Sequence, residues 1–331
     1  MTSDSSILVT GGAGFIGSHA CKALSAAGYK PVVFDNLSTG HADAACFGPL
    51  IVGDIRDQEA VETALKAHGI QAVLHFAAYA YVGESVHEPL AYYDNNLRGL
   101  MSVLAATSAC GVDRIVFSSS CATYGSPDGM PIVETTPQNP INPYGRTKLI
   151  GEQMLSDVAA TSSLRFAALR YFNAAGADPD GQLGERHKPE THLIPLALMA
   201  AGSRRPALSV FGDDYPTPDG TCIRDYIHVC DLARAHVLAL DYLMTGKPTI
   251  KVNLGSGQGH SILEIIREIE AFTGKPLPVR FEPRRPGDPP ILTADSSLAA
   301  EVLSFRTEMS SLRQIITDAA PWFGVEQYAV A

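Results

Sequence analysis

The sequence predicts an α/β protein with a doubly wound parallel sheet and a smaller C-terminal α/β lobe. Two observations predict this class. In the first half, short apolar runs rich in β-branched residues alternate with helix-like segments, as expected for strands buried on both faces of a sheet. After residue 172 this alternation gives way to a loop rich in glycine, aspartate and proline, and then to short helices. We therefore expect one domain over residues 1–172 and a second lobe over 173–331.

The elements follow from the pattern of apolar residues. Strands are predicted at residues 7–9, 32–34, 50–52, 72–76, 114–117 and 166–170. Helices are predicted at residues 19–27, 57–68, 95–110, from about 143 onward, and at 193–201, 229–244 and 261–272. Residues 174–190 are predicted to be a long loop. We expect a segment near 226–250, with the helix at 229–244, to return to the first domain.

Composition and charge exclude several classes of protein. The 331 residues are 46% hydrophobic, which suffices for one large core or two modest ones. A net charge of −10 argues against a nucleic-acid binder. There is no apolar run of about 18 residues, so no membrane span is expected, and the polar start does not resemble a signal peptide. The cysteines form no C-x-x-C pair, so we expect no metal, no disulfides and a cytoplasmic location. They are Cys21, Cys46, Cys110, Cys121, Cys222 and Cys230.

A glycine-rich loop directly follows the first predicted strand and leads into a helix. Its glycines at positions 11, 14 and 17 have the G-x-x-G-x-x-G spacing of a Rossmann-type dinucleotide loop. Such a loop needs a tight turn, close approach of the backbone to a diphosphate, and close packing of helix on strand. This context favours dinucleotide binding over an ordinary turn. The candidate cofactor residues here are Gly11, Gly12, Gly14, Phe15, Ile16 and Gly17.

Polar and small residues end the next strands. Asp35, followed by Asn36, can accept both hydroxyls of an adenosine ribose, and no arginine follows at once, which favours NAD over NADP. Asp54, followed by Ile55, could meet the adenine amine; alternatively it caps the helix at 57–68. Phe76, Ala77 and Ala78 let a cofactor lie close, or pack tightly for structural reasons alone.

Tyr144 and Lys148 lie four residues apart and hence on one helix face. A tyrosine with its ordinary pKa of about 10 is a poor base, and we expect the lysine and a positive nicotinamide ring to lower it. A surface pair would also explain Y-x-x-x-K. The position of the pair favours a catalytic role over a surface pair. Pro143 starts the helix, and the strand before it ends in three serines, of which Ser120 is the last.

With these residues identified, the sequence resembles the extended short-chain dehydrogenase/reductases, and among them the UDP-glucose 4-epimerase family of nucleotide-sugar epimerases. The matching stretches span almost the whole chain. They are TGGAGFIGSH (10–19), HFAAYAYVGESV (75–86), YYDNN (92–96), SSSCATYG (118–125), NPYGRTK (142–148), RYFNAAGA (170–177), DGTCIRDYIHVCDLA (219–233) and RRPGDPP (284–290).

The resemblance implies a bound NAD that is reduced and reoxidised in each turnover of a UDP-sugar, as in galactose metabolism. By position, Tyr144 would be the base at the sugar 4-hydroxyl, Ser120 would hold or relay that proton, and Lys148 would tune Tyr144 and grip the nicotinamide ribose. Asn95 and Phe172 match cofactor contacts, although Phe172 could equally be a core residue.

The resemblance also implies a UDP site in the second lobe and a homodimer. The short strand at Val210 and Phe211 would pair with the uracil edge, and arginines suit a diphosphate because their planar fork offers two donors. Helices 95–110 and 144–160 would form a four-helix dimer interface. The residues that match substrate positions are Asn173, His192, Leu193, Val210, Phe211, Arg224, Arg285, Asp288 and Leu292.

Two departures and several rival functions bear on this expectation. Ala80 stands where relatives often have a lysine near the cofactor diphosphate, and Leu292 where they have Tyr, Cys or Ser. Cys121, Ala122 and Thr123 provide no carboxylate for a dehydratase or decarboxylase. The pair UDP-glucose/UDP-galactose is expected, with UDP-xylose/UDP-arabinose or UDP-GlcNAc/UDP-GalNAc as alternatives. A catalytically inactive NAD-sensing regulator is the alternative of another class.

Overall fold

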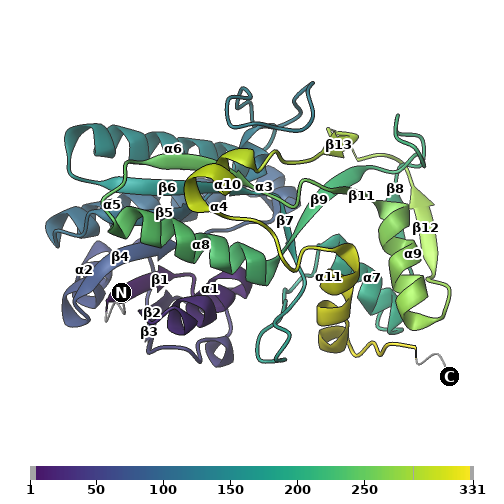
Figure 1. Cartoon of the computed structure of the whole chain (residues 1–331), viewed down its shortest axis with the longest axis horizontal. Coiled ribbons are helices and arrows are strands. Elements are labelled where there is room, and N and C mark those ends of the chain that lie inside the picture. Colours follow the sequence, from purple (N-terminus) through teal and green to yellow (C-terminus); the bar gives the residue numbers. More distant parts are fainter. Residues whose placement is uncertain (1–4, 286, 329–331) are drawn as a thin grey trace.

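The structure, a computed structural model, describes residues 5–285 and 287–328 and has two lobes (Figure 1). The larger lobe is built on a seven-stranded, wholly parallel sheet in the order β10-β6-β5-β4-β1-β2-β3. Its strands are β1 (Ser6–Thr10), β2 (Lys30–Asp35), β3 (Leu50–Val52), β4 (Ile70–His75), β5 (Arg114–Ser118), β6 (Arg165–Tyr171) and β10 (Ile250–Leu254). Six of them confirm the predicted strands; β10 was missed.

Helices cover both faces of this sheet, as predicted for a doubly wound fold. One core layer joins the sheet to α1, α8 and α10, and α8 packs beside α1 although more than 200 residues separate them in the sequence. A second core layer joins the other face to α2, α5 and α6. These helices are α1 (Phe15–Ala26), α8 (Val229–Met244), α10 (Ser297–Leu303), α2 (Gln58–Ala67), α5 (Gly99–Ala109) and α6 (Pro143–Thr161).

The smaller lobe has its own core, at the opposite end of the molecule from α2 (Figure 1). Strand β9 (Ile223–His228) pairs with β7 (Asn173–Ala175), β11 (Gly259–Ser261) and β13 (Ile291–Leu292). The segment predicted as a loop from residue 174 therefore begins inside a strand. The other elements are α7 (Leu193–Ala201), α9 (Ile262–Thr273), α11 (Leu312–Ala319), η4 (Ala320–Phe323) and the pair β8 (Leu208–Phe211) and β12 (Val279–Glu282).

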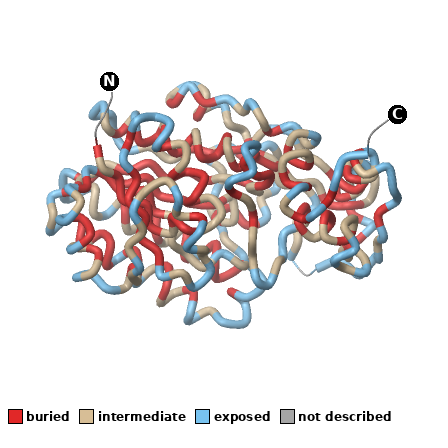
Figure 2. The backbone as a smooth tube through the Cα atoms, turned by 90° about the horizontal axis from the view of Figure 1, so that it is seen from below, coloured by how far each residue is buried: buried red, intermediate tan, exposed pale blue. Residues whose placement is uncertain are grey.

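Short elements complete the chain between the larger ones. The predicted helix at 95–110 is a π-helical turn continued by α5. These elements are η1 (Ala42–Ala44), α3 (Val82–His87), α4 (Pro89–Tyr92), the π-helix η2 (Tyr93–Arg98) and η3 (Cys121–Thr123). Buried residues lie in the interior of both lobes (Figure 2). No helix among the described residues is long and apolar enough to cross a membrane. All six cysteines are free thiols.

Candidate functional site

The glycine loop has the geometry that its spacing predicts. Gly11 has φ of +71°, and a Cβ there would lie 2.6 Å from the backbone nitrogen of Ala77, just after β4. A Cβ on Gly17 would lie 2.2 Å from the carbonyl oxygen of Gly11. Only glycine allows the loop to approach the sheet and the first turn of α1 this closely.

The start of α1 fits a phosphate group. No side chain caps the helix at Gly14, and its first turn carries no acidic residue. A small pocket adjoins Gly14 and Phe15 and is also lined by Thr39 and Arg186. Free amide donors and the positive end of the helix dipole suit an anion at this place. The residues present therefore fit the diphosphate of a dinucleotide.

Asp35 holds the glycine loop in place. Its Oδ2 accepts a hydrogen bond from the amide of Ala13 at 3.0 Å, and its Oδ1 accepts one from the amide of Leu37 at 2.8 Å. Burial raises the pKa of this carboxyl, and the two amide hydrogen bonds oppose the rise. The residue predicted to meet the ribose thus also fixes the loop beside it.

Asp54 lies at the edge of the same region and is paired with Arg56. The guanidinium contacts both carboxylate oxygens, at 2.9 and 2.7 Å, and holds the pKa of Asp54 well below its ordinary value. Asn36 Nδ2 donates to Asp54 Oδ2 at 3.2 Å. The helix cap is Asp57, whose side chain accepts from the amide of Ala60. The alternative role of Asp54 as the cap of α2 was therefore wrong.

Asn96 connects the loop after β4 to the helix that carries Tyr144. Its Oδ1 accepts from the amide of Tyr79 at 2.8 Å, and its Nδ2 donates to Thr147 Oγ1 at 3.0 Å. Asn95 is buried beside it and donates to Asn96 Oδ1 at 3.0 Å. Both asparagines belong to η2. Sequence reasoning singled out Asn95 but missed Asn96, although the pair stands in the YYDNN stretch that carried the resemblance.

Ser118, the last residue of β5, and the two serines that follow it each lie beside one residue on a single face of α6. The Lys148 ammonium donates to the carbonyl of Ser118 at 2.7 Å, and Ser119 Oγ donates to Glu152 Oε1 at 2.6 Å. The hydroxyl of Ser120, which accepts from the amide of Ala122 at 3.1 Å, lies near that of Tyr144 and lowers the pKa of the phenol. Helix α6 begins at Pro143 as predicted, and the Asn142 side chain caps it by accepting from the amide of Gly145. The predicted catalytic residues Ser120, Tyr144 and Lys148 therefore come together.

Burial dominates the electrostatics of these groups. Burial raises the pKa of Tyr144 far above its ordinary value, the neighbouring Tyr171 adds to the rise, and the nearby Ser120 hydroxyl opposes it. Burial lowers the pKa of Lys148 to about 7. In the protein alone, burial therefore outweighs any lowering of the pKa of Tyr144 by Lys148. The Lys148 ammonium is directed at the Ser118 carbonyl and lies 5.9 Å from the centre of the Tyr144 ring.

A buried ion pair supports the serine segment, and sequence reasoning missed it. Arg170 Nη2 lies 2.6 Å from Glu152 Oε2, and both side chains are at most 4% exposed. Arg170 Nη1 also donates to the hydroxyl of Tyr124, which donates to Asn253 Oδ1. Arg170 begins the RYFNAAGA stretch that carried the resemblance, but its partner Glu152 lies in a helix outside every matching stretch, so the pair itself had no sequence signal.

Six of the predicted substrate residues belong to the smaller lobe. Arg224 Nη2 lies 2.5 Å from Asp288 Oδ1, and Leu292 pairs with Arg224 in the register of β13 and β9. The Arg285 guanidinium stacks 3.9 Å above the centre of the Phe211 ring. Val210, the neighbour of Phe211 in β8, is fully buried.

The remaining predicted residues are Phe172, just after β6, Asn173 in β7, and His192 and Leu193 at the start of α7. Phe172 is buried with Tyr124, and the half-buried Leu292 packs against this cluster. Asn173 Nδ2 donates to the carbonyl of Asp225 at 2.8 Å. His192 stands at the start of α7, directly before Leu193, with its Nδ1 2.9 Å from carboxylate oxygens of Glu185 and Glu190. Sequence reasoning identified no role for those two glutamates.

Comparison with known proteins places this arrangement in a family. Residues 7–255 match the NAD dependent epimerase/dehydratase family. A relative from Rhizobium meliloti, named UDP-glucose 4-epimerase, is 51% identical over 319 residues, which cover 96% of this chain and 97% of the relative.

Solved structures agree with the sequence relatives. The UDP-glucose 4-epimerase of Brucella ovis in complex with NAD is 57% identical, with a TM-score of 0.96, and the match covers 98% of this chain and all of that one. The enzyme of Stenotrophomonas maltophila, with bound NAD and formylated UDP-arabinopyranose, is 44% identical, with a TM-score of 0.94 over 97% of this chain and 98% of its own. The chain therefore belongs to the NAD dependent epimerase/dehydratase family.

Proposed function

We propose that this chain is an NAD-dependent UDP-sugar 4-epimerase and that UDP-glucose and UDP-galactose are its preferred pair. The observation that carries the proposal is the convergence of Ser120, Tyr144 and Lys148 at the carboxyl end of β5. The choice of UDP-glucose as substrate is supported by relatives that are named UDP-glucose 4-epimerase. An inactive NAD-sensing regulator would have no need of this buried and complete set.

The glycine loop, the start of α1 and Asp35 would hold the adenosine diphosphate half of the cofactor. Asn95 and Lys148 would meet the nicotinamide half. When bound, oxidised NAD supplies the hydride acceptor for sugar C4 and a positive charge near Tyr144. No other step needs a group from outside the chain and the substrate.

Tyr144 would take the proton of the sugar 4-hydroxyl and return it once the 4-keto sugar has turned over in the pocket. Burial keeps the phenol protonated in the protein alone, so a cation near its oxygen must favour the phenolate. Ser120, whose hydroxyl lies near that of Tyr144, would hold the sugar oxygen and relay the proton. The pair can act in both directions, because the reverse reaction uses the same proton.

The UDP part would lie across the smaller lobe. Arg224 and Arg285 would meet the diphosphate, with Asp288 holding Arg224 in place at 2.5 Å. The edge of β8 at Val210 and Phe211 would meet the uracil, and the start of α7 at His192 and Leu193 would face the phosphates. Asn173 and Leu292 would lie nearer the sugar.

We further propose a homodimer built from α5 and α6. Met101 of α5 is 59% exposed, and Leu90 of the adjoining α4 is 81% exposed. Large apolar side chains exposed beside two long helices suit burial against a second copy. Sedimentation equilibrium tests this proposal, and Met101→Lys would shift the chain toward the monomer.

The decisive experiment is an assay of the purified chain against a panel of UDP-sugars, with NAD supplied and bound NAD measured after denaturation. We expect the fastest turnover with UDP-galactose and UDP-glucose. The panel includes UDP-arabinose and UDP-xylose, because the Stenotrophomonas neighbour holds a UDP-arabinopyranose derivative, and it includes the N-acetylated sugars. Faster turnover of a UDP-pentose or an N-acetylated UDP-sugar would change the assigned substrate. Binding of NAD without formation of any product would instead favour the alternative of a catalytically inactive NAD-sensing regulator.

A further inference from the structure

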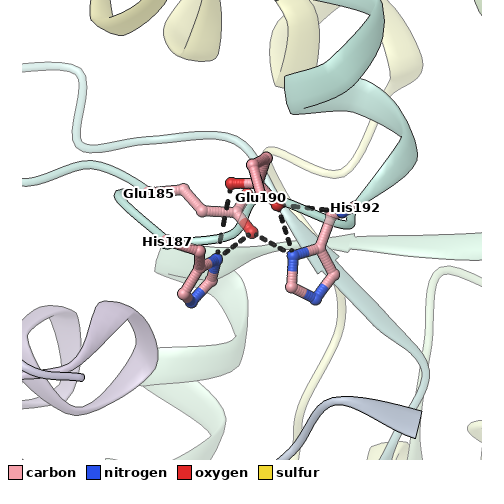
Figure 3. A group of neighbouring side chains, drawn as sticks. All are labelled: Glu185, His187, Glu190 and His192. Carbon is pink, nitrogen blue, oxygen red and sulfur yellow. Dashed lines mark hydrogen bonds and ion pairs between the residues drawn. The ribbon is translucent and has the colours of Figure 1, made fainter. Parts of the chain in front are cut away.

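Four side chains of the segment between β7 and α7 converge on one point (Figure 3). Glu185, His187, Glu190 and His192 each offer one nitrogen or oxygen atom, and these atoms lie within 4.8 Å of one another. The Nδ1 atoms of both histidines face the same carboxylate oxygen of Glu185, at 3.1 and 2.9 Å. Glu190 closes the group from the other side, with its oxygens 3.5 Å from His187 Nδ1 and 2.9 Å from His192 Nδ1.

The geometry points to a binding site for a divalent transition metal, and we propose that its natural occupant is Zn²⁺. Zinc binds imidazole nitrogen at about 2.0–2.1 Å and carboxylate oxygen at about 2.0–2.2 Å in a tetrahedron. The edges of such a tetrahedron are roughly 3.3–3.5 Å. The four separations between an imidazole nitrogen and a carboxylate oxygen run from 2.9 to 3.5 Å, close to that length, and the four ligand atoms as a set lie within 4.8 Å of one another. Movements of the side chains toward a common centre would therefore place them around an ion.

Burial and ligand chemistry support the assignment. The Glu185 side chain is only 4% exposed and that of Glu190 7%. The Nδ1 atom of His187 is buried and has no partner in good hydrogen-bond geometry. Two carboxylates balance the charge of a dication, and two imidazoles with two carboxylates suit zinc better than Mg²⁺ or Ca²⁺, which prefer oxygen ligands alone.

The position of the cluster indicates a structural role. The His187 ring makes edge-on contacts with the rings of Phe15 and Tyr81, at 6.3 and 5.8 Å between ring centres. Phe15 begins α1 directly after the glycine loop, and His192 precedes α7. A bound ion would fix the connecting segment between the two halves of the site. All four positions of the tetrahedron would be filled by protein ligands, which is typical of structural zinc.

The competing explanation is an ion cluster without metal, in which the two glutamates pair with two protonated histidines. It predicts no selective uptake of zinc. Metal content separates the two explanations without reference to sugar turnover, so the result is independent of the proposed epimerase activity.

The experiment uses full-length protein without a histidine tag, stripped with a chelator and dialysed against Zn²⁺ or Co²⁺. We expect one metal per chain by mass spectrometry, the visible absorption of tetrahedral Co²⁺, and a melting temperature that rises with added zinc. His187→Ala should abolish all three. Glu190→Gln should weaken zinc binding at least tenfold, and it serves as the second variant should His187→Ala fail to fold.

The matched control is His260→Ala, which removes a histidine that pairs with a glutamate elsewhere, at 3.9 Å from Glu264. This variant should bind zinc as the parent does. Equal zinc content in the parent and in Glu190→Gln, or no zinc in the parent after dialysis, would overturn the proposal and leave the ion cluster.

Discussion

Ser119 donates a hydrogen bond of 2.6 Å to Glu152, and this contact joins the end of β5 to the helix of Tyr144. The same carboxylate holds Arg170 from β6. Glu152 thus lies between the sheet and α6, two turns beyond Tyr144 on the same helix face. Neutralising Glu152 would weaken its hydrogen bond to Ser119 and its ion pair with Arg170 together.

We therefore predict that Glu152→Gln lowers the free energy of unfolding by about 3–5 kcal/mol, because it leaves the buried Arg170 guanidinium without its counter-charge. Urea denaturation of the parent and the variant measures this. Glu62→Gln is the control, since it removes a glutamate of a solvent-exposed helix pair with Lys66, and it should change stability little. If both variants lost the same free energy of unfolding, the buried ion pair would contribute no more to stability than the exposed one.

Tyr144→Phe keeps the ring and removes the hydroxyl that lies near Ser120. We expect turnover to fall by roughly 10²–10⁴-fold, the usual contribution of a positioned acid–base group. Binding of UDP should be unchanged, because the hydroxyl would meet only the sugar. Steady-state assays and calorimetry with UDP measure the two effects. Tyr328→Phe, which changes an exposed ring, is the control and should keep the activity of the parent. If Tyr144→Phe were as active as this control, Tyr144 would be excluded as the base.

The parts of the fold that could be predicted from the sequence are those with a local signal. Buried runs of β-branched residues identified six strands, and the helix from Pro143 began where predicted. Strand β10 was missed because Lys251 and Asn253 interrupt its apolar residues, and only its pairing with β6 makes it part of the sheet. A strand at the edge of a sheet needs no continuous apolar run.

The site shows the same division. Motif spacing identified the glycine loop and the pair Tyr144 and Lys148, whereas their pKa values depend on burial that spacing cannot report. The cluster around His187 was missed because its ligands lack the spacing of common zinc motifs. Its convergence depends on the path of the segment from residue 185 to residue 192.

Ala80 is exposed in the loop that follows β4, at a position where the family resemblance leads us to expect a lysine. Without that cation we predict that part of the bound NAD dissociates on dilution, so that added NAD raises the activity. The start of α1 still offers amide donors, and the loss should be partial. The amount of NAD that stays bound is measured after gel filtration, by fluorescence or by release of the cofactor. The variant Ala80→Lys should lose less NAD than the parent. A parent protein that keeps one NAD per chain through extensive dialysis would contradict this prediction.

His236 on α8 is buried against the ring of Phe76, at 4.6 Å between ring centres, and burial lowers its pKa to about 4. A histidine with a lowered pKa in the folded state stabilises the fold fully above its ordinary pKa of about 6.5, and this contribution is lost as the pH falls toward the folded value. We therefore expect the free energy of unfolding to fall between pH 6.5 and pH 4.

The variant His236→Gln should make that pH dependence shallower, since each unit of pKa difference corresponds to about 1.4 kcal/mol. Urea denaturation at a series of pH values gives the slope. His260→Gln, at a half-buried position in the smaller lobe, is the control and should leave the slope unchanged. An unaltered slope in His236→Gln would show that this histidine does not contribute to the loss of stability in acid.

Leu292 lies in β13 beside Arg224 and packs half-buried against the cluster of Phe172 and Tyr124. We predict that it limits the sugars that can turn in the pocket, because an N-acetyl group at C2 needs room and leucine offers it no hydrogen bond. One or two methylene groups in such a pocket are worth ~1–3 kcal/mol, so the preference for UDP-galactose over UDP-N-acetylgalactosamine should be roughly 10–200-fold.

Substitution at this position separates a gate from a packing residue. Leu292→Ser should narrow the preference by opening space, and Leu292→Tyr should widen it by filling that space, both with little change for UDP-glucose. The measurement is the ratio of kcat/KM for the two substrates in each variant. Because Leu292 also packs on Phe172, loss of packing alone would slow both substrates in parallel. A ratio that stays constant across the three proteins would therefore assign Leu292 to the core and not to the gate.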